Sequence, residues 1–133
     1  MVAVCYIAQA TTLNTHFKHN GYTTISLGKV FHFPDDNRDG WSEKPWRPTV
    51  SDYHNPEVQE AAIAAHRAKY PERKQVRGMP YEASDDPDES YRDYETASKA
   101  IEYLTRFADG EEPFFLAVGF NKPHLPFCAS RRL

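Results

Sequence analysis

The amino-acid sequence predicts an α/β protein in which parallel strands are flanked by helices and joined by long loops. A helical segment followed by a strand-like segment occurs twice, over residues 12–27 and 91–120. The second strand-like segment, Pro113–Phe120, contains an unbroken apolar run, which is typical of a strand buried on both faces in a parallel sheet. Two strands and three helices do not close such a domain, so we expect the sheet to need strands that this chain does not supply.

The first helix is expected over Thr12–Asn20. Leu13 and Phe17 lie four residues apart and therefore on one helical face, and Gly21 supplies the left-handed residue that ends many helices. Tyr22–Leu27 follows as a short strand, because it is rich in β-branched and aromatic residues.

The middle of the chain is predicted to be a long irregular segment followed by a surface helix. Phe33–His54 carries three prolines and many charged residues, and Trp41 and Trp46 favour an ordered, packed loop. Asn55–Tyr70 is expected to be a helix with an asparagine cap and Pro56 in its first turn. Its apolar face is thin, so we expect it to cover the surface rather than to form the core.

The remainder is predicted to hold a loop over Val76–Glu89 and a helix over Tyr91–Ala108 that is capped by Ser90. The apolar residues of this helix form one stripe, the pattern of a helix that packs on a core: Tyr94, Ala97, Ile101, Leu104 and Ala108. Four acidic residues lead into the helix: Asp85, Asp86, Asp88 and Glu89. Negative charge stabilises a helix N-terminus, and a metal site is the alternative interpretation of this acidic run.

Length and composition exclude several classes of protein. At 133 residues the chain is about one small domain, and 40% hydrophobic residues are enough for a core. A net charge of −3 argues against general nucleic-acid binding, and two cysteines exclude a disulfide-dense scaffold and a four-cysteine zinc site. No apolar run reaches the roughly 20 residues of a membrane span. Met1–Ala10 lacks a basic leader, so no signal peptide is expected.

A lysine and a histidine follow each predicted strand. Lys29 and His32 come after the first strand, and Lys122 and His124 come after the second. Ligands bind at the carboxyl ends of strands in open α/β sheets, so neighbouring strands would bring these four side chains together. Lysine attracts an anionic substrate and histidine moves protons near neutral pH, which predicts catalysis on an anion. The alternative is that the histidines are surface residues and that the lysine-histidine spacing arises by chance.

Both motifs and their surroundings resemble one enzyme family. The segments Phe17–His32 and Pro113–Phe127 are similar to an internal segment of sulfatases of the iduronate-2-sulfatase type. The helix Tyr91–Phe107 and the acidic residues before it resemble a helix of the same type at the same place in the order of that family's elements. The resemblance covers about Thr11 to Phe127.

The resemblance implies an alkaline-phosphatase-like α/β fold and hydrolysis of sulfate esters of a sulfated sugar or polysaccharide. Sulfatases of this family use a formylglycine made from a cysteine, next to a calcium ion. The family also implies a periplasmic, secreted or lysosomal location. The net charge and the lack of a long apolar run predict no nucleic-acid and no membrane partner. Residues 11–128 would then be a partial catalytic domain, and residues 1–10 and 129–133 would be atypical ends.

The resemblance also implies roles for individual residues. Lys29 would contact the sulfate, and His32 would take the proton from the formylglycine hydroxyl. His124 would bind the sulfate and protonate the leaving alcohol. Lys122 would line the substrate pocket, with an ordinary surface lysine as the alternative.

Other parts of the family's site are not recognisable in the sequence. The family's nucleophile lies in a Cys-x-Pro-x-Arg motif; Cys5 lacks the proline and the arginine, and Cys128 follows His124, in the wrong order. The paired aspartates and the Asp-His-Gly motif that hold calcium are not identifiable either. Asp35-Asp36 follows the first lysine-histidine motif, so we do not assign it to the metal.

Two main interpretations remain open. The chain is either a fragment of a sulfatase that is inactive alone, or a non-enzymatic remnant that binds anions through Lys29, His32 and His124. A phosphate-ester hydrolase of the same superfamily is a third interpretation, but the lysine-histidine motifs favour sulfate.

Overall fold

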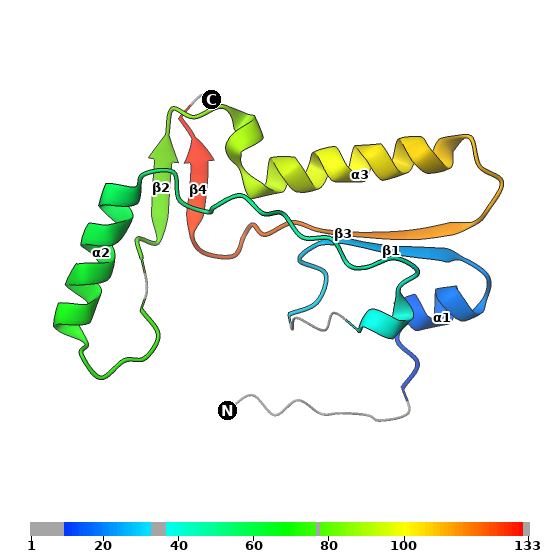
Figure 1. Ribbon diagram of the computed structural model, residues 1–133, viewed down its shortest axis with the longest axis horizontal. Coiled ribbons are helices and arrows are strands. Elements are labelled where there is room, and N and C mark those ends of the chain that lie inside the picture. Colours follow the sequence, from blue (N-terminus) through cyan, green and yellow to red (C-terminus); the bar gives the residue numbers. More distant parts are fainter. Residues whose placement is uncertain (1–9, 33–36, 77, 132–133) are drawn as a thin grey trace.

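The computed structural model describes residues 10–32, 37–76 and 78–131 (Figure 1). The expectations for Cys5, for Asp35-Asp36 and for most of the first ten residues therefore lie outside the described residues. The elements follow one another as α1 (Leu13–His19), β1 (Thr23–Gly28), η1 (Arg38–Gly40), α2 (Pro56–Lys69), β2 (Tyr81–Ser84), η2 (Asp88–Ser90), α3 (Arg92–Ala108), β3 (Phe114–Gly119) and β4 (Phe127–Ser130).

The strands form two small parallel sheets. Strand β1 pairs with β3 in a register that runs from Thr23 opposite Phe114 to Gly28 opposite Gly119. Strand β2 pairs with β4, also in parallel. Figure 1 shows α3 along one face of the β1–β3 sheet and α1 on the other, with α2 at the far end of the molecule. The predicted α/β class with parallel strands is confirmed.

The core lies between the β1–β3 sheet and α3. Its buried residues are Ile25, Leu27 and Ala100, and five half-buried residues pack against them: Trp46, Tyr103, Phe107, Leu116 and Val118. Full burial of a side chain the size of Leu27 stabilises a fold by about 1.5–3 kcal/mol, so this cluster stabilises the packing of α3 on the sheet.

The outer edge of β1 is covered by the irregular segment Ser42–Trp46, which we call the edge segment. Ser42 N donates to Thr24 O at 2.8 Å, and Trp46 N donates to Ser26 O at 3.0 Å. Gly28 N in turn donates to Trp46 O at 2.8 Å. The predicted ordered loop is thereby confirmed in this part, and β1 is bonded along both edges. Among the described residues no strand pairs with the outer edge of β3.

The first two predicted helices have the expected ends. Gly21 follows α1 with a left-handed φ of 82°, as its position after a helix predicted. Helix α2 begins after Asn55, whose side-chain oxygen accepts from Val58 N at 3.2 Å. None of its residues is buried, so the prediction of a surface helix is confirmed.

Two short strands were missed by the sequence prediction. The expected loop Val76–Glu89 contains β2, and the expected end of the chain contains β4. Each has four residues, and Tyr81 and Phe127 in these strands are exposed, so neither shows the apolar run of a buried strand. Their stability comes from backbone pairing between segments far apart in sequence, which has no local signature.

The apolar stripe predicted for the last helix is wrong. Tyr94, Ile101 and Leu104 are 43%, 64% and 49% exposed. The face that meets the sheet instead carries Thr96, Ala100, Tyr103 and Phe107. The helix approaches the sheet closely at Thr96, because a Cβ at Gly28 would lie 2.9 Å from the Thr96 methyl group.

Two further expectations need smaller corrections. Ser90 lies in η2, and the helix begins one residue after Tyr91 rather than from a serine cap. Strand β3 is half-buried instead of buried on both faces, because only the β1 side of this strand has a neighbour among the described residues. No helix in the described ranges is long and apolar enough to cross a membrane.

Candidate functional site

The carboxyl ends of β1 and β3 lie side by side. Gly28 and Gly119 are in register, and Lys29 N donates to Gly119 O at 2.7 Å. A Cβ on Gly119 would overlap the Lys29 carbonyl group, and one on Gly28 would overlap the Gly119 carbonyl oxygen. The close approach therefore requires glycine on both strands, and it brings the loops that follow the two strands to one edge.

A groove of about 280 Å³ lies at this edge. Its lining residues come from both strand ends, from the segment after the edge segment and from the start of α3: Gly28, Lys29, Arg47, Pro48, Arg92, Asp93, Thr96, Gly119 and Asn121. Three cationic side chains, Lys29, Arg47 and Arg92, thus face one carboxylate in a chain whose net charge is −3.

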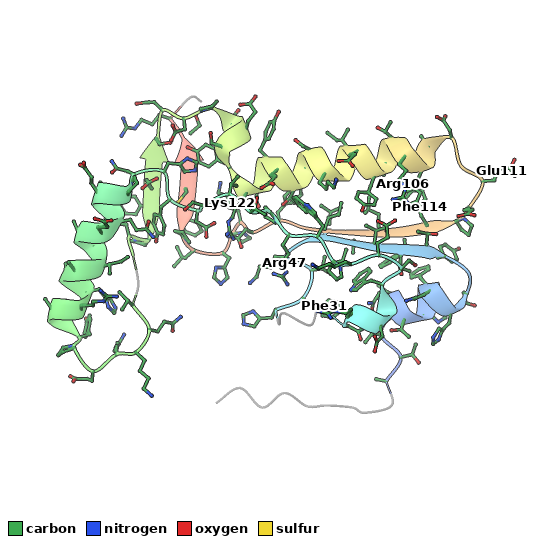
Figure 2. The ribbon with its side chains drawn as sticks, in the orientation of Figure 1. Phe31, Arg47, Arg106, Glu111, Phe114 and Lys122 are labelled. Carbon is green, nitrogen blue, oxygen red and sulfur yellow. The ribbon has the colours of Figure 1, made fainter. Side chains whose placement is uncertain are left out.

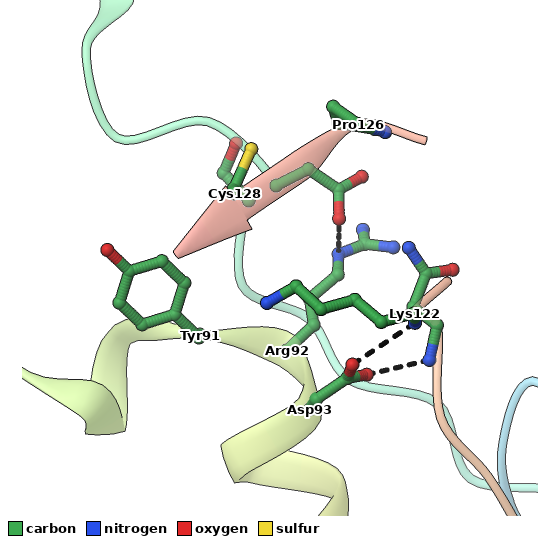
Figure 3. Close-up of a pocket in the computed structure, with 9 residues that line it drawn as sticks. Tyr91, Arg92, Asp93, Lys122, Pro126 and Cys128 are labelled. Atoms are coloured by element: carbon green, nitrogen blue, oxygen red, sulfur yellow. Dashed lines mark hydrogen bonds and ion pairs between the residues drawn. The ribbon is translucent and has the colours of Figure 1, made fainter. Parts of the chain in front are cut away.

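The carboxylate of Asp93 is engaged with the backbone of the loop after β3. Its Oδ1 accepts from Asn121 N at 2.7 Å, and its Oδ2 accepts from Lys122 N at 3.1 Å (Figure 3). Asp93 also lies in the first turn of α3, where negative charge is favourable. It therefore holds the second lysine-histidine loop to the helix rather than cancelling the charge of the lysines.

Arg92 fixes the opposite wall of the groove. Its Nε donates to Val50 O at 2.8 Å and lies 3.1 Å from Asp52 Oδ1. Arg92, Asp93 and Asn121 also line a second cavity, of about 20 Å³, which Lys122 lines as well.

Lys122 lies in this second cavity, not in the groove. Its Nζ is 5.5 Å from the centre of the Tyr91 ring, and Figure 3 shows the side chain extending along α3 toward that ring. A cation over an aromatic face is attracted by the ring's electron density. The structure therefore places Lys29 and Lys122 in adjacent cavities that share three lining residues.

The two histidines lie on the loops at the same edge but do not line the groove. His32 is exposed after β1, and His124 is exposed after β3. The Nδ1 of His124 lies 2.6 Å from Leu125 O and donates to it, because a carbonyl oxygen can only accept. This bond occupies Nδ1, so Nε2 is the ring nitrogen of His124 that can contact a bound molecule.

Sequence reasoning missed the arginines of the groove. Arg47 donates from Nη2 to Phe31 O at 3.1 Å, which fixes it beside the first lysine-histidine loop (Figure 2). It follows the edge segment, and no motif around it marks it as a site residue. The backbone pairing of Trp46 with β1 brings Arg47 to the strand end.

Cys128 is buried in the wall of the second cavity, 4% exposed. Burial raises its pKa to about 11, with a smaller contribution from the charge of Glu82. A thiol is nucleophilic only as thiolate, so Cys128 is a poor nucleophile near neutral pH. This agrees with the sequence argument that placed it outside the nucleophile motif.

A calcium site does not fit the described part of the chain. Within residues 10–32, 37–76 and 78–131, no three or more His, Cys, Asp or Glu side chains are grouped so that they could hold a metal ion. The acidic residues before α3 make other contacts: Asp86 accepts from Ser84 Oγ at 2.8 Å and lies 3.1 Å from His54 Nδ1.

Comparison with known proteins places these features in context. No protein-family model matches the chain. The chain is 33% identical to mouse iduronate 2-sulfatase over 126 residues, which covers 88% of this chain and 21% of the mouse protein. It is also 33% identical to human iduronate 2-sulfatase over 125 residues, with the same shares. The chain thus spans about a fifth of the length of these curated relatives.

Proposed function

The chain is related to the sulfatases of the iduronate-2-sulfatase type, and on this premise we propose that it forms the sulfate-binding and proton-transfer part of a sulfuric ester hydrolase. The single observation that carries the proposal is the parallel pairing of β1 with β3, which brings both lysine-histidine loops to one edge. The proposed substrate is a sulfate ester of a sugar or polysaccharide. The proposed compartment is the periplasm, the lysosome or the outside of the cell.

The charge of the groove suits this substrate. Cleavage of a sulfate ester spreads negative charge over the sulfate and leaving-group oxygens. Preorganised cations at such positions stabilise the transition state, and the groove offers Lys29 and Arg47, while Arg92 is already paired with Asp52. The carboxylate of Asp93 is held by two backbone N–H groups, so it repels the anion less than a free carboxylate would.

We assign roles to the loop residues accordingly. Lys29 holds sulfate oxygens, and His124 protonates the leaving alcohol from Nε2, since its Nδ1 is bonded to Leu125 O. His32 accepts the proton of the formylglycine hydroxyl after the alcohol has left. Lys122 lines the neighbouring cavity, on the path by which the substrate would approach the groove. The formylglycine of sulfatases supplies the nucleophile when it is present. Calcium ligands do not fit the described residues, so no role is assigned to that ion.

A second function, anion binding without catalysis, is favoured by the state of Cys128. Cys128 is buried in the neighbouring cavity rather than in the groove, and the burial that raises its pKa disfavours the thiolate, so Cys128 does not supply a nucleophile to a sulfate in the groove. We therefore expect the purified chain to give no turnover of an aryl sulfate above buffer. Steady hydrolysis that disappears in His124→Ala would show that the chain is an enzyme by itself and would overturn the fragment interpretation.

The proposed catalytic roles are best tested in a larger protein. Residues 11–127 of this chain would replace the matching segment of mouse iduronate 2-sulfatase. In an active chimera, Lys29→Ala should lower kcat by a factor that corresponds to about 3 kcal/mol, the effect of losing one preorganised charge stabiliser. Lys44→Ala, an exposed lysine outside the groove, is the matched control and should leave kcat unchanged.

The acid role of His124 has a sharper test. His124→Ala should reduce kcat/KM more for alkyl sulfates than for activated aryl sulfates, because a good leaving group needs less protonation. The measurement is kcat/KM over a series of sulfate esters graded by the pKa of the leaving group, with exposed His19→Ala as the control. An equal loss for every ester would reduce His124 to a sulfate ligand.

A further inference from the structure

Positive charge gathers at a second place, far from the groove. The last turn of α2 and the segment after it, residues 66–74, carry four cationic side chains and one anionic one. We call this segment the basic turn. Its cations are all exposed: Arg67, Lys69, Arg73 and Lys74. Figure 1 shows α2 at the opposite end of the molecule from the β1–β3 sheet, and none of these four residues lines the groove.

The geometry of the basic turn is held by Tyr70. Its backbone N donates to His66 O at 2.9 Å, and its O accepts from Arg73 N at 3.1 Å. Lys69 Nζ lies 5.4 Å and the Arg73 guanidinium carbon 4.6 Å from the centre of its ring. The two cations are therefore oriented by one aromatic side chain rather than by acidic partners.

Within the described part of the chain, no carboxylate forms an ion pair with any cation of the basic turn. Cations near a helix C-terminus also stabilise the helix dipole, and this accounts for Arg67 and Lys69. It does not account for Arg73 and Lys74, which lie beyond the helix. The turn thus presents more positive charge than the helix requires.

We propose that the basic turn binds a linear sulfated polysaccharide outside the groove, as a second contact for the polymer whose sulfate ester enters the groove. The inference rests on the proposed function for the class of polymer. Clusters of lysine and arginine attract polyanions such as heparin and nucleic acids. A sulfated polysaccharide is favoured because single-stranded nucleic acid needs a free aromatic face for base stacking, and Lys69 and Arg73 cover the Tyr70 ring.

The test is the affinity of the full chain for a heparin oligosaccharide at several salt concentrations. Lys69→Gln/Arg73→Gln should weaken binding by about tenfold, as expected for two exposed charge pairs. It should also reduce the slope of log affinity against log salt by roughly 2, because two fewer cations displace counterions. Arg38→Gln/Lys44→Gln removes the same charge from exposed residues near the β1–β3 sheet and should change the affinity less than twofold.

One further variant and two further ligands complete the binding test. Lys69→Arg/Arg73→Lys keeps the charge and should keep the affinity; loss of binding in this variant would mean that structure rather than charge is responsible, and would overturn the proposal. An equal loss in both glutamine pairs would overturn it as well. So would equally tight binding of a desulfated oligosaccharide or of an oligothymidine.

The failure of this inference is distinguishable from failure of the proposed function. Binding is measured without catalysis, so an inactive chimera does not affect the result. In an active chimera, Lys69→Gln/Arg73→Gln should leave kcat/KM for a small aryl sulfate unchanged and raise KM for the polymer. An unchanged KM for the polymer would overturn the second contact while leaving the groove's role intact.

Discussion

Two glycines set the distance between the strand ends that carry the candidate site. Gly28 has a left-handed φ of 71°, which other residues rarely adopt, and Cβ atoms on Gly28 and Gly119 would overlap backbone. The lysine-histidine motifs are therefore positioned by residues that take no part in chemistry.

The first prediction concerns these glycines. Gly28→Ala should destabilise the chain by about 1–3 kcal/mol, because it combines a strained φ with a backbone overlap. The matched control is Gly110→Ala, where the nearest atom to the new Cβ is 3.6 Å away, and its effect should stay within about 0.5 kcal/mol. Urea unfolding of both variants measures the difference in stability. Equal unfolding midpoints would contradict the conclusion that position 28 requires glycine.

The second prediction concerns a hydrogen bond that fastens the edge segment to α3. Tyr103 OH donates to Glu43 Oε2 at 2.7 Å, and Arg106 Nη1 lies 2.7 Å from Glu43 Oε1. The hydrogen bond from Tyr103 is the main cause that lowers the pKa of Glu43, while burial and this bond raise the pKa of Tyr103 to about 12.

Tyr103→Phe should therefore loosen the edge segment by about 1 kcal/mol, somewhat less than is usual for a hydrogen bond to a charged group, because Glu43 is partly exposed. A lowered carboxyl pKa stabilises the fold above its unfolded value of 4.5, and this stabilisation is lost as pH falls through the lower folded value. The difference between wild type and variant should thus shrink in acid. The measurement is the hydrogen-exchange rate of the Trp46 amide in wild type and variant over a range of pH, with Tyr94→Phe, at an exposed tyrosine, as the control. A difference in exchange that does not change with pH would show that the Glu43 carboxylate is not responsible.

At the scale of elements, α3 shows which side chains hold the two layers together. Its sheet-facing residues include Phe107, whose ring stacks on Phe114 with centroids 4.6 Å apart. Ile101 on the opposite face is 64% exposed. Hydrophobic character alone therefore does not identify the packed face of this helix.

The third prediction follows from that contrast. Phe107→Ala should cost about 2–3 kcal/mol, somewhat less than a fully buried phenylalanine, because the side chain is half-buried. Ile101→Ala should cost less than about 0.5 kcal/mol. Thermal unfolding monitored by circular dichroism compares the stability of the two variants. A larger loss of stability in Ile101→Ala would mean that the helix packs through the apolar stripe that the sequence predicted.

The elements also show what could be read from the sequence. Helix α2 and the pair β1 and β3 were predictable, because caps, glycine stops and an apolar run are local signals. Strands β2 and β4 were not, because four-residue strands with exposed Tyr81 and Phe127 gain their stability only from pairing across more than 40 residues.

The candidate site likewise contains residues whose placement could be predicted from the sequence and residues whose placement could not. Lys29 and Lys122 follow recognisable strands, so their placement at one edge could be predicted. Arg47 could not, because it reaches the site through the edge segment, whose bonds to β1 have no sequence pattern. The roles of His32 and His124 stay predictions, since neither side chain lines the groove.

At the scale of the whole molecule, apolar surface is left uncovered around β3. Phe120, just after the strand, is 51% exposed, and no strand pairs with this edge among the described residues. Unpaired strand edges with apolar neighbours promote association between chains.

The fourth prediction is that the isolated chain associates through this edge. Phe120→Lys should shift the chain toward the monomer, because it replaces exposed apolar surface at the end of the unpaired strand by a charge. Leu13→Lys places the same charge on exposed α1 and should leave association unchanged. Sedimentation velocity over a range of concentrations tests this, and an equal shift in both variants would point to general solubility instead of the edge.

Because the edge segment is bonded to β1, a further strand can extend the β1–β3 sheet at one edge only. Since Ser42–Trp46 already occupies one side of β1, an added strand can join only beside β3. The wall of the groove that carries Lys29 and Arg47 is bordered by the edge segment, whereas an added strand would lie beside the end of β3 that leads to Asn121 and Lys122.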